Sequence, residues 1–126
     1  FCGPEVLRRI LGGSEVTKAE FEGEFYRKAL GIKSFMSSEF DKAFKKVDCI
    51  VLPVSPKLPW KVGDHKKMKI ADIYAADALT IPANLAGICA VSVPAGEIEK
   101  IPVGLQVMCG KGEESKMFGI AEKFER

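Results

Sequence analysis

The sequence predicts one α/β domain with the element order helix, helix, strand, helix, strand, strand, helix. Three observations predict this class. Apolar residues recur at steps of three and four along residues 17–47, which is the period of an amphipathic helix. Continuous apolar runs of strand length occur at residues 49–54, 89–94 and 103–108. The chain has 126 residues, enough for a single hydrophobic core, so residues 1–126 are assigned to a single domain.

The first helix is expected over residues 4–11. Pro4 suits the first helical position, and the pair Gly12 and Gly13 follows as a stop signal.

The second helix is expected to begin at Thr17 and to continue to Val47. Glu20 stands three residues after Thr17, which is the spacing of a capping box. Phenylalanines are frequent in the apolar stripe of this helix, and such a stripe is typical of a face packed in a core.

The run CIVLPV at residues 49–54 is apolar without interruption, which indicates a strand covered on both faces. Several prolines then force an extended, irregular exit from the strand. The polar stretch that follows contains the one histidine of the chain, His65, among lysines. This position is typical of a surface histidine rather than of a catalyst.

A helical run from Ile70 onward is expected to carry Asp77. At helical spacing Asp77 shares a face with the apolar residues Ile70, Ile73 and Tyr74. A carboxylate buried on that face is costly unless it is paired or hydrogen-bonded. We therefore expect Asp77 to cap another group, to pair with a cation or to point into a polar cavity.

Pro82 interrupts this run and can open a second short helix that ends at Gly87. The strands at 89–94 and 103–108 come next. Residues 95–102 link them, a length that permits antiparallel pairing but exceeds a two-residue turn. The last helix is indicated by the spacing of Met117, Ile120, Ala121 and Phe124.

Composition excludes several functional classes. A net charge of +2 is too small to indicate nucleic-acid or membrane binding. No apolar run approaches the roughly 20 residues that span a bilayer, and arginines interrupt the apolar N-terminal segment, so no signal peptide is expected. The chain opens on Phe1 rather than Met, which suggests an excised or processed piece.

The cysteines form no C-x-x-C pair and are expected to be reduced core thiols of a cytoplasmic protein: Cys2, Cys49, Cys89 and Cys109.

No catalytic motif is complete in the sequence. There is no G-x-S-x-G elbow and no glycine-rich phosphate loop. Ser92 lies inside an apolar strand, where we expect its hydroxyl to bond to the backbone. The acidic residues near His65 lack metal-ligand spacing. From the residues alone the chain is a soluble α/β domain whose activity stays undefined.

Five segments nevertheless resemble, in order, the C-terminal part of the amidase-signature family: EVLRRILGG (5–13), FYRKAL (25–30), FDKAFKKVDCIVLPVSP (40–56), IYAADALTIPANLAG (73–87) and SVPAGEIEKIPVGLQVM (92–108). The succession of NLAG, SVPAG and PVGLQ is specific for that family. The R-R-I and Y-x-x-D helices are most similar to the A subunits of glutamyl-tRNA(Gln) amidotransferases. The sequence departs from the usual pattern after Gly12, which favours an archaeal-type subgroup.

The resemblance implies a C-terminal portion of an α/β/α fold around a mixed sheet, so that residues 1–126 form a single partial domain. It also implies a parent enzyme that hydrolyses glutamine through a serine, a second serine and a lysine. The released ammonia converts Glu-tRNA(Gln) to Gln-tRNA(Gln) on a partner subunit. The triad lies upstream in the family and has no counterpart here. No catalytic residue is therefore expected in this chain, and the chain alone is expected to be inactive.

Two substrate-binding residues carry over from the resemblance. Arg9 matches the second arginine of R-R-I, and Asp77 matches the aspartate of Y-x-x-D. They are expected to hold the α-carboxylate and the α-amino group of glutamine, because an arginine fork suits a carboxylate and an aspartate suits an ammonium. Asn84 and Gln106 fall in motif segments and are interpreted as structural.

The resemblance further implies the surroundings of the chain. No cofactor or metal is expected on the chain itself, whereas ATP and Mg are expected on the partner subunit. The expected partners are glutamine as substrate, the amidotransferase subunits B and C, and tRNA indirectly through the partner subunit, without a membrane.

Two other functions are open alternatives at this point. The chain could be a fragment of another amidase-signature amide hydrolase acting on small amides, in which Asp77 is structural. In a different class, it could be a stand-alone, non-catalytic binding or assembly module built on part of the amidase fold.

Overall fold

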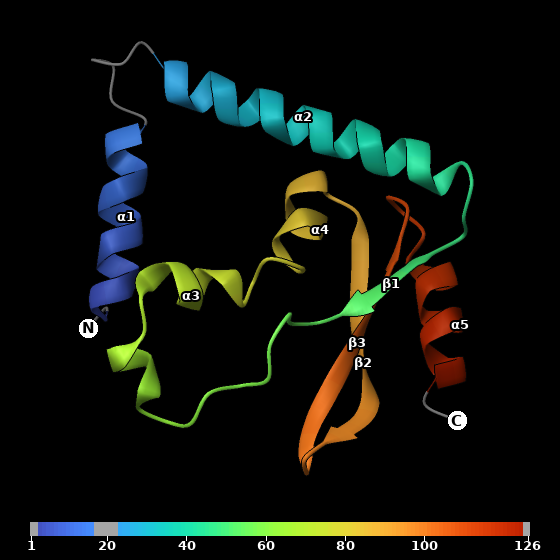
Figure 1. Ribbon diagram of the computed structural model, residues 1–126. Helices are drawn as coiled ribbons and strands as arrows, with labels where there is room; N and C mark the ends of the chain where they lie inside the picture. The colour runs from blue at the N-terminus through green and yellow to red at the C-terminus, as the bar shows by residue number, and fades with distance from the viewer. Residues whose placement is uncertain (1–2, 17–22, 125–126) are drawn as a thin grey trace. The chain divides into compact units, whose positions relative to one another are not determined.

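A computed structural model describes residues 3–16 and 23–124 of the chain (Figure 1). They belong to two compact units, residues 1–35 and residues 36–126. The first unit contains helix α1 and the beginning of helix α2. The second unit contains the end of α2, the whole sheet and the remaining helices. The assignment of residues 1–126 to a single partial domain stays a prediction.

Helix α1 spans Pro4–Val16, so the predicted stop at Gly12 and Gly13 is wrong. A glycine inside a helix costs only about 1 kcal/mol relative to alanine, which the surrounding turns can offset. Ser14 lies directly after the pair, and its Oγ donates to the carbonyls of Ile10 and Leu11 at 3.0 and 3.1 Å.

Helix α2 spans Glu24–Phe44 and ends before Val47, the predicted last residue. The capping box at Thr17 and Glu20 lies outside the described residues. No described side chain of α2 is buried, so the interpretation of its aromatic stripe as a packed core face is not met in the described part of the chain. Phe40 and Phe44 stack on each other, with ring centroids 6.2 Å apart.

The sheet of the second unit confirms the α/β class and all three predicted strands. Strands β1 (Ile50–Pro53), β2 (Cys89–Ile98) and β3 (Ile101–Cys109) lie in the order β1-β3-β2, and both pairings are antiparallel. Strand β1 is an edge strand whose side chains alternate between half-buried and exposed. The prediction that both its faces are covered is therefore wrong, because continuous cover is typical of buried parallel strands.

The β2–β3 connection is tighter than the sequence predicts. Both strands extend into residues 95–102, and Ile98 pairs with Ile101. Glu99 and Lys100 alone form the turn, with φ values of 52° and 65°. A register shift between Pro94 and Glu97 places one extra residue on β2. The expectation that the link is too long for a two-residue turn is wrong, because both strands extend into the link and the bulge takes up the one extra residue on β2.

One face of the sheet forms the core with helix α5 (Glu114–Phe124), which packs against β2 and β3 (Figure 1). Alternate residues of the two strands point toward this helix, as the pleat of a strand requires. Cys109 and Val107 are fully buried there, and Cys49 and Cys89 are partly buried against the same cluster. These three thiols are free, which confirms the prediction of reduced core cysteines for them. Cys2 lies outside the described residues.

Three short helices connect β1 to β2. They are the 3-10 helix η2 (Asp64–Lys67), α3 (Ile70–Ala75) and α4 (Ile81–Ala86). Pro82 stands in the first turn of α4, and Gly87 ends α4 with φ 70°, which confirms the predicted second short helix. His65 belongs to η2, and its side chain lies outside the described side chains. Across residues 3–16 and 23–124, no helix combines the length and the apolar character that crossing a bilayer requires.

Candidate functional site

Asp77 lies in the turn between α3 and α4 and is exposed. Helix α3 ends at Ala75, and the chain continues through tight turns in which the amide of Asp77 donates to the carbonyl of Tyr74 at 3.2 Å. The prediction that a helix carries Asp77 on its buried face is therefore wrong. The steps of three and four that relate Ile70 to Asp77 extend past the point where the helix stops.

The backbone of Asp77, rather than its side chain, stabilises the turn. Its carbonyl accepts hydrogen bonds from the amides of Thr80 and Ile81 at 3.1 and 3.0 Å and from Thr80 Oγ1 at 3.2 Å. Within residues 3–16 and 23–124, the Asp77 carboxylate makes no ion pair and no side-chain hydrogen bond. Of the three roles expected for this carboxylate, the structure supports the one at a cavity.

Asp77 lines a cavity of about 300 Å³, here called the Asp77 cavity. Its wall also contains Lys57, Trp60 and Asp72, with Thr80 beside Asp77. Lys57 Nζ lies 3.9 Å from Asp72 Oδ1 and forms a solvent-exposed ion pair with it. The sequence did not single out Lys57, Trp60 and Asp72. Lys57 and Trp60 belong to the proline-rich segment after β1, and only the fold places that segment beside the Asp77 turn. A carboxylate without a cationic partner, at the wall of a small cavity, suits an ammonium group.

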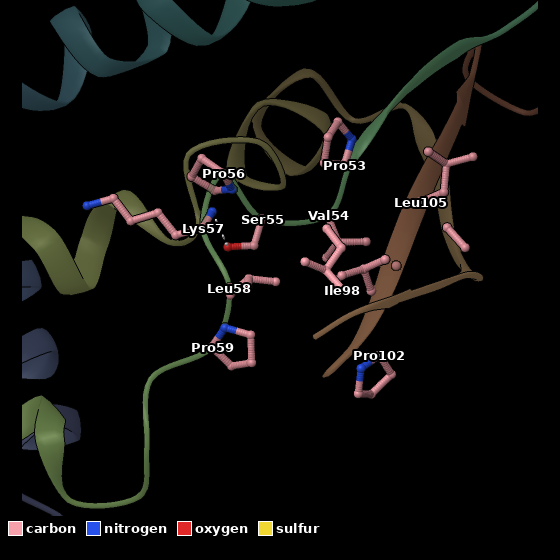
Figure 2. A pocket seen from close by; sticks show the side chains of 13 residues that line it. Pro53, Val54, Ser55, Pro56, Lys57, Leu58, Pro59, Ile98, Pro102 and Leu105 are labelled. Carbon is pink, nitrogen blue, oxygen red and sulfur yellow. Dashed lines mark hydrogen bonds between the residues drawn. The ribbon is translucent and has the colours of Figure 1, made fainter. Parts of the chain in front are cut away.

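A larger and mostly apolar hollow, the proline groove, adjoins the Asp77 cavity. Its volume is about 530 Å³ and it lies between residues 53–59 and the β2–β3 hairpin. Figure 2 shows Leu58 and Pro59 on one side and Ile98 and Pro102 on the other. Within residues 53–59, the Oγ of Ser55 accepts a hydrogen bond from the amide of Lys57 at 3.5 Å.

A third hollow, the Ser92 cavity, has a volume of about 310 Å³ and a more polar wall. Ser92, Thr80, Asn84 and Gln106 contribute polar groups to it. Val54 lines all three hollows, so they meet where the chain leaves β1. In the described part of the chain, Ser92 Oγ makes no hydrogen bond, and the predicted bond to the backbone is not found there.

Asn84 and Gln106 both bond to backbone carbonyls of the turn that carries Asp77. Asn84 Nδ2 donates to the Thr80 carbonyl at 3.0 Å. Gln106 Nε2 donates to the Leu79 carbonyl at 3.0 Å, from a side chain that is only 4% exposed. These contacts agree with the structural interpretation of both residues.

Arg9 lies on α1 in the first unit, with an exposed side chain. Its Nε donates to Glu5 Oε1 at 2.9 Å. Hydrogen bonds from Arg8 and then from Arg9 hold the pKa of the Glu5 carboxyl below its usual value. Of the two predicted substrate-binding residues, Arg9 belongs to the first unit and Asp77 to the second.

No metal centre is indicated in the described residues. Among the described side chains, which leave out His65 and Lys66, there is no group of three or more histidine, cysteine, aspartate or glutamate residues arranged to hold an ion. Cys109 is buried in the core, and this burial raises the pKa of its thiol. A raised pKa disfavours the thiolate, which is the form that binds metals.

Comparison with known proteins identifies the family of this fold and site. A family model described as Amidase matches residues 1–118. The chain therefore belongs to the amidase family.

Within this family, the chain is similar to one component of a particular enzyme. It is 43% identical to the A subunit of glutamyl-tRNA(Gln) amidotransferase from Methanocaldococcus jannaschii, over 99% of this chain and 28% of the relative. It is 45% identical to the protein of the same name from Methanobrevibacter smithii, over 98% of this chain and 27% of the relative. The chain thus spans little more than a quarter of the length of these relatives.

Two solved structures share the fold. The crystal structure of the glutamyl-tRNA(Gln) amidotransferase A subunit from Thermotoga maritima matches 96% of this chain and 26% of its own, with a TM-score of 0.75 and 36% identity. The crystal structure of an amidase matches 95% of this chain and 27% of its own, with a TM-score of 0.80 and 28% identity.

Proposed function

We propose that this chain is the C-terminal portion of the glutaminase subunit of a tRNA-dependent amidotransferase. The parent enzyme hydrolyses glutamine, and the ammonia converts Glu-tRNA(Gln) to Gln-tRNA(Gln). This chain contributes Arg9 and Asp77 to glutamine binding. The catalytic serine, its partner serine and the lysine come from the remainder of the parent, so the chain alone is inactive. Support comes from the 43% and 45% identity to A subunits, against 28% to the amidase of known structure.

The observation that carries this proposal is the Asp77 carboxylate itself. It is exposed at the wall of a cavity of about 300 Å³, and among the described residues no cation neutralises it. The hydrogen bonds by which Asp77 stabilises the turn are accepted by its backbone carbonyl. The α-ammonium of glutamine supplies the missing positive charge. Arg9 holds the α-carboxylate through its guanidinium, which the Glu5 carboxylate orients from one turn away.

The proposal places the chain in a larger assembly. Subunits B and C are its protein partners, and the tRNA is contacted through the partner subunit. ATP and Mg bind on that partner, where the acceptor carboxylate is activated, and no cofactor binds to this chain. The assembly works in the cytoplasm without a membrane.

Glutaminase kinetics of the intact parent enzyme test the proposal. Asp77→Asn and Arg9→Lys should each raise KM for glutamine by about 10- to 100-fold, because a hydrogen bond to a charged group contributes about 1.5–3 kcal/mol. The matched control is Asp72→Asn, which alters a carboxylate of the same cavity that already pairs with Lys57. It should leave KM within about twofold of the original value. Unchanged glutamine kinetics in both test variants would refute the assignment.

A second candidate is favoured by the TM-score of 0.80 to the amidase structure, namely a hydrolase of small amides. Butyramide distinguishes the two, because it has the amide of glutamine without the α-carboxylate and the α-amino group. In an amidotransferase, Asp77→Asn weakens only glutamine turnover. In a small-amide hydrolase, butyramide is the better substrate, and Asp77→Asn changes the kinetics of both amides equally.

A further inference from the structure

The buried amide of Gln106 is a polar group whose role extends beyond the sheet. Gln106 lies on β3, the central strand, where it pairs in register with Leu52 on one side and Ser92 on the other. It is the one buried polar residue in the described part of the chain, at 4% exposure. A buried amide is costly unless it is hydrogen-bonded, so the group that accepts its hydrogen bond matters.

That acceptor belongs to the turn that carries Asp77. Gln106 Nε2 donates to the Leu79 carbonyl at 3.0 Å, across 27 positions of sequence. Side chains alternate along a strand, so Gln106 points to the face opposite Val107 and Cys109, away from the α5 core. Among the described residues, no other side chain of the sheet hydrogen-bonds to residues 76–80.

The other hydrogen bonds of the turn, among the described residues, are local. The carbonyl of Asp77 accepts from Thr80 and Ile81, and Asn84 donates back to Thr80 within the same helical turn. These bonds lie within residues 77–84 and do not reach the sheet. The Gln106 bond ties the turn to β3, two residues from Asp77, and so limits its opening.

We infer that Gln106 is a positioning residue that holds the Asp77 turn against the sheet and so aims the Asp77 carboxylate at the α-ammonium of the substrate. The inference rests on the proposed function, because it requires that Asp77 bind the substrate. Gln106 acts through the Leu79 carbonyl and does not itself touch the ammonium.

The test is a double-mutant cycle in the intact enzyme that contains this chain. Gln106→Met keeps the length of the side chain and removes the donor, whereas Gln106→Glu keeps the shape and faces the Leu79 carbonyl with an acceptor. Each should raise KM for glutamine by about three- to tenfold and leave kcat within about twofold, because one net hydrogen bond is lost from the positioning of a binding group. In the Asp77→Asn background, neither substitution should raise KM further.

Asn84→Ala is the matched control. It removes an amide-to-carbonyl bond of the same length to the same turn, but Asn84 is exposed and water can replace it. This variant should leave KM unchanged, and a rise equal to that of Gln106→Met would overturn the inference. Hydrogen exchange of the Thr80 and Ile81 amides supplies a readout without activity. Both should exchange faster in the Gln106 variants, and unchanged exchange would also overturn it.

Failure of the inference and failure of the proposed function are distinguishable. If Asp77→Asn leaves KM unchanged, the proposed function fails. If Asp77→Asn raises KM while both Gln106 variants leave it unchanged, or raise it equally in the Asp77→Asn background, the positioning role alone fails. A Gln106→Met variant that does not fold is replaced by Gln106→Glu, and the exchange readout applies to either.

Discussion

Gly104 is the position at which we predict a packing defect most directly from the structure. It lies on β3, and its carbonyl accepts a hydrogen bond from the amide of Val54 at 3.1 Å. A Cβ on Gly104 would lie 2.9 Å from Val54 Cγ2 and 2.9 Å from Ser92 Oγ. These separations are below van der Waals contact, so Gly104→Ala requires a neighbour to move.

The two neighbours differ in how easily they move. Ser92 is exposed and its hydroxyl can rotate away, whereas Val54 is β-branched and stiff about χ1. The clash therefore acts on Val54, where the three hollows meet. Overpacking costs about 1–3 kcal/mol. The lower chain entropy of alanine in the unfolded state offsets about 0.4–1 kcal/mol of this cost. We expect Gly104→Ala to lower the free energy of unfolding by about 0.5–2 kcal/mol.

Urea unfolding, followed by the fluorescence of Trp60, the one tryptophan of the chain, measures this effect. In the double variant with Val54→Ala, the clash is relieved, so the two substitutions should couple favourably by about 1 kcal/mol. Gly119→Ala on α5 is the matched control. Nothing lies within 4 Å of its Cβ position, and it should stabilise the chain by up to about 1 kcal/mol. A Gly104→Ala variant as stable as the original chain, or an additive double variant, would refute the reasoning.

Three further predictions concern the stability of the second unit. Met117→Ala removes a side chain that is 3% exposed in the core and should cost about 2–4 kcal/mol, whereas Phe118→Ala, at 58% exposure, should cost less than about 0.5 kcal/mol in the same urea titration. Lys100→Gly should raise the melting temperature, because Lys100 has a φ of 65° that glycine adopts without strain; a lower melting temperature would contradict this. The hydrogen bond from Lys116 lowers the pKa of Glu113 below that of an ordinary glutamate, so the stabilisation from this carboxylate is complete above the ordinary glutamate pKa and is lost as the pH falls through the lowered pKa. Melting temperatures of Glu113→Gln and the original chain should therefore differ at neutral pH and converge once the pH falls below the lowered pKa of Glu113, and a difference that persists in acid would count against the mechanism.

Element types could be predicted from the sequence because each depends on local periodicity. The three apolar runs at residues 49–54, 89–94 and 103–108 all became strands, and the Pro82 and Gly87 signals bound a real helix. The ends of the helices and strands were harder to predict than their types. Whether the Gly12 and Gly13 pair stops a helix depends on a balance of about 1 kcal/mol per residue, which sequence alone does not resolve.

The hairpin and the cavities show why other features could not be predicted. The two-residue turn at Glu99 and Lys100 depends on how far the pairing of the two strands extends, which the local sequence does not define. Lys57 and Trp60 line the same cavity as Asp77, although they belong to an earlier segment of the chain. Gln106 finds its carbonyl across 27 positions. Such contacts depend on the path of the chain in space, for which a period of two or of 3.6 residues carries no information.

One prediction about Asp77 was wrong and another was supported. Its carboxylate is not buried, but it does line a cavity. Helical periodicity predicted a buried carboxylate in need of a partner, but α3 ends at Ala75 and the side chain is exposed. An exposed carboxylate needs no partner for folding, and the contribution of Asp77 to the turn comes from its carbonyl, which accepts hydrogen bonds from Thr80 and Ile81. Backbone and side chain of this residue thus have separate tasks. Since the carboxylate contributes nothing visible to the fold, its replacement should alter ligand binding without altering stability. A buried structural aspartate would behave in the opposite way, because its removal would destabilise the fold first.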